Sequence, residues 1–231
     1  YIEMTRHIME EFGAKVVFRE SEIVVEPCPY TPVAFRVESD WSAASYFYEL
    51  LAVSGAGEIR MPGLLQHSTQ GDSGQAGVWE KLGVSTSFEA GGVVIAAGKP
   101  KVSELEYDFV EMPDVVQSFT VACCVMGVPF RFTGVETLRI KETDRLKALA
   151  DELEKLGYIL NIEGDNILSW DGTCKQAGKP EIATYHDHRM AMAFAPAALK
   201  HRGMVIVDKE VVTKSFPGYW DELQKFCDGQ N

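Results

Sequence analysis

Apolar positions along the chain switch between a helical and a strand period, and the switch recurs three times. Three segments each combine the last turns of an amphipathic helix, a glycine and a short apolar run: 9–18, 79–88 and 153–162. A glycine after the last periodic residue is typical of a helix end, and the run that follows is typical of a strand. A polar turn and a second apolar run come next, which predicts hairpin partners at 22–26, 92–97 and 166–170.

A second landmark repeats with a similar step. Asp40, Asp114 and Asp187 lie 74 and 73 residues apart, and each opens an apolar stretch that predicts a buried helix. A glycine and a strand follow each stretch, at 58–61, 129–133 and 204–207. A second helix is then predicted at 73–82, 144–156 and 218–226. With a lead-in strand before each aspartate, one unit reads βαβαββ. We therefore expect an α/β fold in which repeated βαβαββ units pack around buried helices.

The first copy of the repeat holds only its second half, residues 1–27. A proline-rich stretch, 27–32, follows it, and three prolines in six residues favour a linker over a strand. We expect residues 1–32 to be the remnant of an N-terminal domain with its crossover, and residues 33–231 to form a C-terminal domain. The phase of the repeat also predicts that the natural protein extends toward its N-terminus, so the chain would hold one full domain and part of a second.

Composition narrows the class of protein. Acidic residues outnumber basic ones, 34 to 22, which argues against nucleic-acid binding. The five cysteines are odd in number and lack metal-ligand spacing, which fits a reduced, cytoplasmic compartment. Cys123 and Cys124 lie in an apolar helical stretch and are expected to be buried free thiols. No run of eighteen apolar residues predicts a membrane span.

Cations stand at helix starts, where the helix dipole disfavours them. Lys141 precedes the predicted helix at 144–156 and Arg145 lies in its first turn, with Asp144 (or Thr143) as a good N-cap. Two such cations repel each other unless an anion lies between them, so a phosphate or carboxylate ligand is expected. The alternative is that Glu142 and Asp144 neutralise the two cations on a solvated surface.

The same pattern recurs one repeat later. Asp187 can cap the helix expected at 190–199, which leaves His188 and Arg189 at its mouth. Because the helix is apolar and buried, Arg189 needs a partner, either Asp187 or an anionic ligand. His188 can equally be a packing histidine.

Two further residues occupy equivalent places. Lys214 precedes the helix start of the last repeat, and Asp114 with Gln117 resembles a capping box. If the repeats pack about a pseudo-threefold axis, these helix starts converge, and Asp114 and Glu142 lie beside the three cations. Such a site would bind an anion and carry acid–base groups.

Together these segments resemble the signature segments of the EPSP synthase (3-phosphoshikimate 1-carboxyvinyltransferase) family, in that family's order. The matching segments are 141–145, 187–192 and 214–217, supported by 112–114, 38–40 and 66–72. The resemblance implies two domains, each of three βαβαββ units forming an inside-out barrel around buried helices, which close on the substrates. It implies a monomer in the cytoplasm, with no metal or organic cofactor and no nucleic-acid or membrane partner.

The resemblance also implies an activity in the shikimate pathway of aromatic amino-acid and chorismate biosynthesis. The enolpyruvyl (carboxyvinyl) group of phosphoenolpyruvate would pass to the 5-hydroxyl of shikimate 3-phosphate, with release of phosphate. Asp114 would take the hydroxyl proton, and Glu142 would protonate the methylene carbon with help from Lys214. Arg145, Arg189 and Lys214 would hold phosphoenolpyruvate.

Further residues would bind substrate. Lys141 and Tyr1 would contact shikimate 3-phosphate, and His188 belongs to the same substrate-binding set. Thr137 stands where many members of the family have an asparagine that touches shikimate 3-phosphate. The family's N-terminal Lys-Ser-Arg, glycine-rich and Ser-Ser-Gln segments are absent from these residues, so we expect the chain alone, without the N-terminal part of the same protein, to be inactive.

Two alternatives remain. A UDP-N-acetylglucosamine enolpyruvyl transferase would share the fold and the reaction type. A non-catalytic anion-binding repeat domain would bear the cations without the chemistry, and Asp114 and Glu142 would then lie apart from them.

Overall fold

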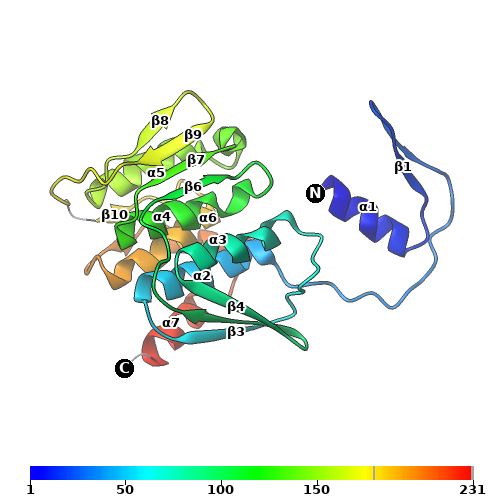
Figure 1. Cartoon of the computed structure of the whole chain (residues 1–231), viewed down its shortest axis with the longest axis horizontal. Helices are drawn as coiled ribbons and strands as arrows, with labels where there is room; N and C mark the ends of the chain where they lie inside the picture. The colour runs from blue at the N-terminus through cyan, green and yellow to red at the C-terminus, as the bar shows by residue number, and fades with distance from the viewer. Residues whose placement is uncertain (179, 230–231) are drawn as a thin grey trace.

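The computed structural model describes residues 1–178 and 180–229. From Trp41 onward the chain forms one body in which helices interleave with small sheets, whereas the N-terminal lobe, residues 1–25, lies to one side (Figure 1). This lobe contains α1 (Ile2–Glu11) and a hairpin of β1 (Val16–Phe18) with β2 (Ile23–Val25). The joining residues, 26–40, hold no helix or strand.

The lead-in strand expected before Asp40 is therefore wrong. The segment before Asp40 crosses between the lobe and the body, so it lacks a neighbouring strand to pair with. β3 (Glu58–Pro62) pairs antiparallel with β5 (Gly92–Ala97) and, within the described residues, with no lead-in strand.

Three central helices form the middle of the body. They are α2 (Trp41–Ser54), α4 (Val116–Met126) and α6 (His188–Phe194), which occupy equivalent places in the repeats and pack against one another. Most of their residues are buried on every side, as the apolar stretches predict. The helix expected at 190–199 begins earlier and changes at Ala195 to the 3-10 helix η4 (Ala195–Leu199), where Pro196 removes a backbone donor.

Small sheets and outer helices cover these central helices. The middle repeat is a complete βαβαββ unit whose sheet order is β6-β7-β9-β8, with β6 and β7 parallel and the other pairs antiparallel. Its elements are β6 (Leu105–Asp108), α4, β7 (Phe130–Thr133), α5 (Arg145–Lys155), β8 (Asn161–Glu163) and β9 (Ile167–Trp170). The parallel pair requires a crossover, and α4 provides it.

The other two repeats are partial versions of this unit. In the first, β3, β5 and β4 (Val84–Glu89) form an antiparallel sheet, with α3 (Gln75–Lys81) before β4. In the last, β10 (Glu181–Ile182) and β11 (Val205–Ile206) pair in parallel, and α7 (Tyr219–Gly229) follows. The predicted fold class is thus confirmed.

Packing matches the sequence pattern in two further respects. The apolar face of α5 is buried, and the thiols of Cys123 and Cys124 are free and buried. Among the described residues, every helix is too short or too polar to traverse a lipid bilayer.

Glu49 is an acidic group inside the core, on α2. Its side chain is 0% exposed, and among the described residues the nearby Ser118 hydroxyl offsets only part of the cost of a charge there. Burial raises the pKa of this carboxyl well above its ordinary value, so the folded protein holds a proton there that the unfolded chain releases. The free energy of unfolding should therefore fall as the pH rises above about 4, the ordinary range for a glutamate.

Glu49→Gln should stabilise the full-length protein at pH 8, because a neutral amide does not have to take up a proton when the chain folds. We expect a gain of about 1–3 kcal/mol at pH 8 that shrinks toward zero below pH 4. Thermal unfolding across this pH range measures it, with exposed Glu58→Gln as the control. A gain in unfolding free energy that does not change with pH would contradict the raised pKa of Glu49.

Candidate active site

The predicted helix starts meet at the carboxylate of Asp114. This residue lies in the 3-10 turn η2 (Pro113–Val115), just before α4. Its Oδ1 lies 3.1 Å from Lys141 Nζ and 3.2 Å from Arg145 Nη1. Its Oδ2 lies 3.5 Å from Arg189 Nη2, and its backbone carbonyl accepts from Arg189 Nη1 at 3.1 Å. The guanidinium groups at the starts of α5 and α6 therefore share one carboxylate.

Asp114 does not form the expected capping box with Gln117. Neither η2 nor α4 has a side-chain cap, and the Gln117 amide is buried without a hydrogen-bond partner in the described part of the chain. The Asp114 carboxylate faces the cations instead and also accepts from the Tyr1 hydroxyl at 2.7 Å. Charge-assisted bonds to several donors are stronger than one bond to a backbone N–H, which explains the difference.

Arg145 is held by three carboxylates. Its Nε donates to Asp187 Oδ2 at 2.7 Å, and its Nη2 donates to Glu142 Oε2 at 2.7 Å, besides the Asp114 contact. The side chain is 1% exposed, so the alternative of a solvated surface pair does not hold for Arg145. Asp144 instead caps α5 by accepting from the Lys147 N–H. The buried guanidinium links three segments of the chain.

Lys214 extends the cluster at its exposed side. It ends the 3-10 helix η5 (Lys209–Lys214), and its Nζ donates to Glu142 Oε1 at 3.0 Å. Lys214 is 62% exposed and Glu142 is 30% exposed, so solvent reaches this pair. Glu142 therefore bridges an exposed cation, Lys214, and a buried one, Arg145.

Ionisation follows from these contacts. Burial opposes the charge of Asp114, but Arg189, the Tyr1 hydroxyl and Lys141 outweigh it and lower the pKa of Asp114 to about 2. Burial likewise opposes the charge of Glu142, but Lys214 and Arg145 outweigh it and lower its pKa to about 2. Both groups are carboxylates at neutral pH.

Two predicted site residues, His188 and Thr137, have no hydrogen bond or ion pair with Asp114 among the described residues. His188 is buried beside Asp187, 3.9 Å from Nδ1 to Oδ1, and burial followed by Arg189 lowers its pKa, so it is neutral at pH 7. Thr137 lies exposed in the 3-10 helix η3 (Glu136–Ile140), and in the described part of the chain no hydrogen bond or ion pair joins its side chain to the cluster.

Asp72 ends the matching segment 66–72, and no role was predicted for it from the sequence, although its carboxylate lies near Arg189 and Asp114. It lies in η1 (Gly71–Gly74), is 8% exposed and accepts from the Ser42 hydroxyl. Burial raises its pKa, while the charge of nearby Arg189 opposes the shift. Asp72 lies before α3 at the position that Glu142 occupies before α5, so comparison of the repeats could have predicted a carboxylate there.

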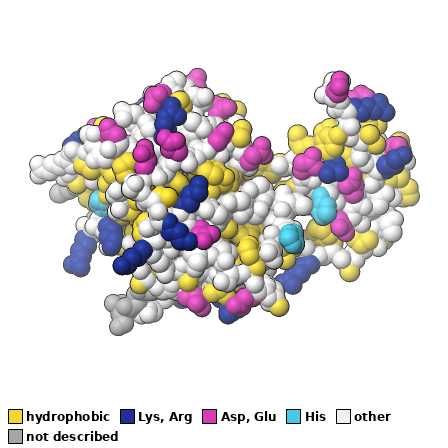
Figure 2. All heavy atoms as spheres, in the orientation of Figure 1, with side chains coloured by type: hydrophobic (Ala, Val, Ile, Leu, Met, Phe, Trp, Pro, Cys, Tyr) yellow, Lys and Arg dark blue, Asp and Glu magenta, His cyan; other side chains and the backbone are white. Residues whose placement is uncertain are grey.

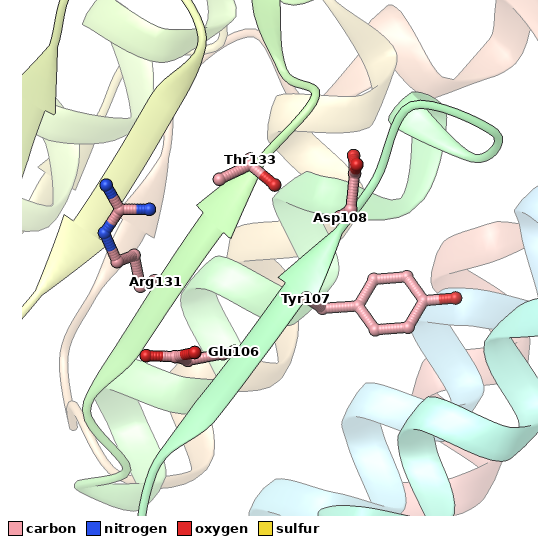
Figure 3. Close-up of a pocket in the computed structure, with 5 residues that line it drawn as sticks. All are labelled: Glu106, Tyr107, Asp108, Arg131 and Thr133. Carbon is pink, nitrogen blue, oxygen red and sulfur yellow. The ribbon is translucent and has the colours of Figure 1, made fainter.

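A hollow of about 270 Å³ lies elsewhere, on the outer face of the four-stranded sheet (Figure 3). Glu106 and Asp108 of β6 and Arg131 and Thr133 of β7 line it. Arg131 is already paired with Glu163, 3.7 Å away, and none of the lining residues belongs to the Asp114 cluster. The hollow is a groove on a polar sheet face.

Comparison with known proteins shows to which family the chain belongs. The profile of the family described as EPSP synthase (3-phosphoshikimate 1-carboxyvinyltransferase) matches residues 1–223. The chain belongs to the EPSP synthase family. A 3-phosphoshikimate 1-carboxyvinyltransferase of Bacteroides fragilis is 49% identical over 227 residues, which are 97% of this chain and 55% of that protein. One from Methanoregula boonei is 36% identical over 97% of this chain and 53% of its own length.

The fold agrees with this assignment. An EPSP synthase structure from Acinetobacter baumannii superposes with a TM-score of 0.75 at 22% identity, over 96% of this chain and 53% of that one. The chain thus spans about half the length of the EPSP synthase relatives that it matches.

Proposed function

We propose that the protein containing this chain transfers the enolpyruvyl group of phosphoenolpyruvate to the 5-hydroxyl of shikimate 3-phosphate and releases phosphate. The observation that carries the proposal is the meeting of cations from separate repeats at one carboxylate, Asp114. Anion-binding groups and a base thus lie within contact of each other, as a reaction between two anionic substrates requires.

Substrate binding would exchange partners within the cluster. Arg189 and Lys214 now neutralise Asp114 and Glu142. The carboxylate and phosphate of phosphoenolpyruvate would take over these cations and at least one contact of Arg145. Losing its cations would raise the pKa of Asp114 from about 2 toward a value at which it can accept a proton.

Proton transfer would then use both carboxylates. Asp114 would take the proton of the 5-hydroxyl as its oxygen bonds to carbon 2 of phosphoenolpyruvate. The methylene carbon gains a proton in this step and loses it again when phosphate leaves. In the free protein the pKa of Glu142 is about 2, so the Lys214 ammonium 3.0 Å away carries the proton of that pair. When phosphoenolpyruvate takes over Lys214, the pKa of Glu142 would rise as that of Asp114 does, and Glu142 could share this proton transfer.

Shikimate 3-phosphate would occupy the side of Asp114 nearest Lys141 and Tyr1. The Tyr1 hydroxyl already donates to Asp114, and Lys141 Nζ lies 3.1 Å from it, so both would turn to the substrate as it approaches the base. Thr137 and His188 complete the proposed set at the periphery.

Residues 1–32 would belong to a second domain, with 33–231 as the C-terminal domain. Figure 2 shows hydrophobic side chains on the surface of the N-terminal lobe, where Ile2 is 62% exposed and Ile23 and Val25 are each 46% exposed. An apolar groove of about 230 Å³ runs between α1 and the hairpin. A lobe with so much exposed apolar surface needs further chain to cover it, and the relatives' additional length provides the residues.

The alternatives have less support. Asp114 and Glu142 lie among the cations, whereas a passive anion-binding repeat does not need them there. The B. fragilis and M. boonei relatives both carry the name of the shikimate enzyme, which favours shikimate 3-phosphate over UDP-N-acetylglucosamine as the acceptor.

A phosphate-release assay on the full-length protein tests the proposal. We expect release that requires both substrates, and little or none from residues 1–231 alone. Robust turnover by the isolated chain would show that the absent segments are unnecessary. No turnover by the full-length protein would remove the proposed function.

Arg189→Ala in the full-length protein should raise the KM for phosphoenolpyruvate by about 10- to 100-fold, since a charged hydrogen bond contributes about 1.5–3 kcal/mol. The KM for shikimate 3-phosphate should change much less. Initial rates at varied concentrations of each substrate measure both constants, with the surface variant Arg131→Ala as the control. Unchanged kinetics would place Arg189 outside the site.

A further inference from the structure

A turn with an unusual backbone stands directly before α6. The Asp187 N–H closes it by donating to the Thr184 carbonyl at 2.8 Å. Its central residues, Tyr185 and His186, have φ angles of 54° and 55°. Positive φ at both positions is the pattern of a type I′ turn, in which glycine, asparagine and aspartate predominate. Histidine tolerates this region better than a bulky tyrosine does, so the strain falls mainly on Tyr185.

The Tyr185 side chain has a buried partner that holds this conformation. Its hydroxyl donates to Glu152 Oε1 at 2.7 Å, and Glu152, on α5, is 0% exposed. The other oxygen of Glu152 accepts from the Ala183 N–H at 2.9 Å and from Lys155 Nζ at 2.5 Å. One carboxylate therefore fixes the chain just before the turn and the tyrosine within it.

The α5 helix is thus joined to this segment at two levels. Arg145, at the start of α5, binds Asp187, and Glu152, about two turns later, binds Tyr185. Asp187 in turn accepts from the Arg189 N–H at 2.9 Å, and the Arg189 guanidinium reaches the Asp114 carbonyl at 3.1 Å. If the turn relaxed, Asp187 would shift, and the Arg189 guanidinium would no longer be held against Asp114.

We propose that the hydrogen bond between the Tyr185 hydroxyl and the Glu152 carboxylate forms a latch that keeps the 184–187 turn in its strained conformation. The latch thereby orients the Arg189 guanidinium toward Asp114, where phosphoenolpyruvate is proposed to bind. Tyr185 is then a positioning residue, not a catalytic one. The inference rests on the proposed function, because it explains how the cation assigned to phosphoenolpyruvate is aimed. It assigns a task to two residues that the reaction itself does not use.

The latch reverses the usual order of severity between two substitutions. Tyr185→Phe removes the hydroxyl but leaves a bulky ring at positive φ. Tyr185→Asn also removes the hydroxyl, but asparagine tolerates positive φ without strain. A tyrosine that only covered surface would be replaced best by phenylalanine. A latched tyrosine is replaced worst by phenylalanine, because the strain remains and nothing opposes it.

Amide hydrogen exchange of the substrate-free, full-length protein tests the latch without reference to activity. In Tyr185→Phe we expect exchange at the Asp187 amide to be about tenfold faster than in the parent, and in Tyr185→Asn within about twofold of it. Tyr158→Phe is the matched control, because its hydroxyl pairs with His201 at 2.9 Å, and it should leave the Asp187 amide unchanged. Equal exchange in the parent and Tyr185→Phe, or faster exchange in Tyr185→Asn than in Tyr185→Phe, would overturn the latch. If only one variant folds, survival of the asparagine variant supports the latch and survival of the phenylalanine variant overturns it.

Steady-state kinetics then tests whether the latch affects phosphoenolpyruvate binding through Arg189. Tyr185→Phe should raise the KM for phosphoenolpyruvate about five- to tenfold and leave the KM for shikimate 3-phosphate unchanged, and Tyr185→Asn should recover most of the loss. Faster exchange with an unchanged KM for phosphoenolpyruvate would overturn the aiming of Arg189 while the proposed function stands. Absence of turnover in the parent would remove the proposed function, and the exchange result would still decide the latch.

Discussion

Asp114→Asn in the full-length protein is expected to lower kcat by about 10²- to 10⁴-fold, the range for loss of a positioned general base. Asparagine fits the same space but cannot accept the hydroxyl proton. It also removes the charge that faces Lys141, Arg145 and Arg189, so substrate binding should persist or tighten while turnover falls. Steady-state and single-turnover rates measure the effect, and exposed Asp165→Asn is the control.

The pH dependence of kcat/KM and of kcat distinguishes the pKa of Asp114 in the free protein from its pKa in the substrate complex. In the free protein its pKa is about 2, so kcat/KM should stay flat as the pH falls until substrate groups titrate. In the proposed complex the cations would bind the substrate, so the pKa of Asp114 would be higher and the acidic limb of kcat should lie at higher pH. Full activity in Asp114→Asn would show that another group takes the proton.

Arg145→Gln is expected to destabilise the protein by about 3–5 kcal/mol at pH 7, because it leaves Asp114, Glu142 and Asp187 buried or half-buried near one another without their shared cation. In the parent the pKa values of Asp114 and Glu142 are about 2, so their stabilising contribution is present above about pH 4 and is lost as the pH falls toward 2. The difference between parent and variant should therefore be largest at neutral pH and shrink in acid.

Denaturant unfolding at pH 7 and at about pH 3, inside the range where the contribution is lost, checks this result. Arg131→Gln is the matched control, since that arginine is 40% exposed and pairs with Glu163 at the surface. Arg131→Gln should lower the free energy of unfolding by less than about 1 kcal/mol at either pH. A loss for Arg145→Gln no larger than that of the control would mean that the three carboxylates do not depend on this cation.

Local signals explain why most elements could be predicted from the sequence. Glycines such as Gly127, with φ of 72°, end helices through their own backbone freedom, and apolar periodicity marks the buried faces of neighbouring elements. The convergence at Asp114 was also predictable, because equivalent places in a repeat occupy equivalent places in the fold. Asp72 follows the same rule and could have been found by it.

Other features depend on residues distant in sequence and could not be predicted. The capping interpretation of Asp114 failed because cations 27 and more residues away compete for its carboxylate. The burial of Arg145 depends on Asp187, 42 residues later. The missing strand before Asp40 reflects the path of the chain between two parts of the molecule. The backbone strain at Tyr185 leaves no mark on hydrophobic periodicity.

Phosphorus NMR of the full-length protein with phosphoenolpyruvate and shikimate 3-phosphate follows the proposed transfer itself, because both substrates and both products carry phosphorus. We expect the phosphoenolpyruvate resonance to give way to inorganic phosphate, the shikimate 3-phosphate resonance to shift to that of a new enol ether in equal amount, and UDP-N-acetylglucosamine to fail as a replacement acceptor. Phosphate release without the new ether, or transfer to the nucleotide sugar instead, would contradict the proposed transfer.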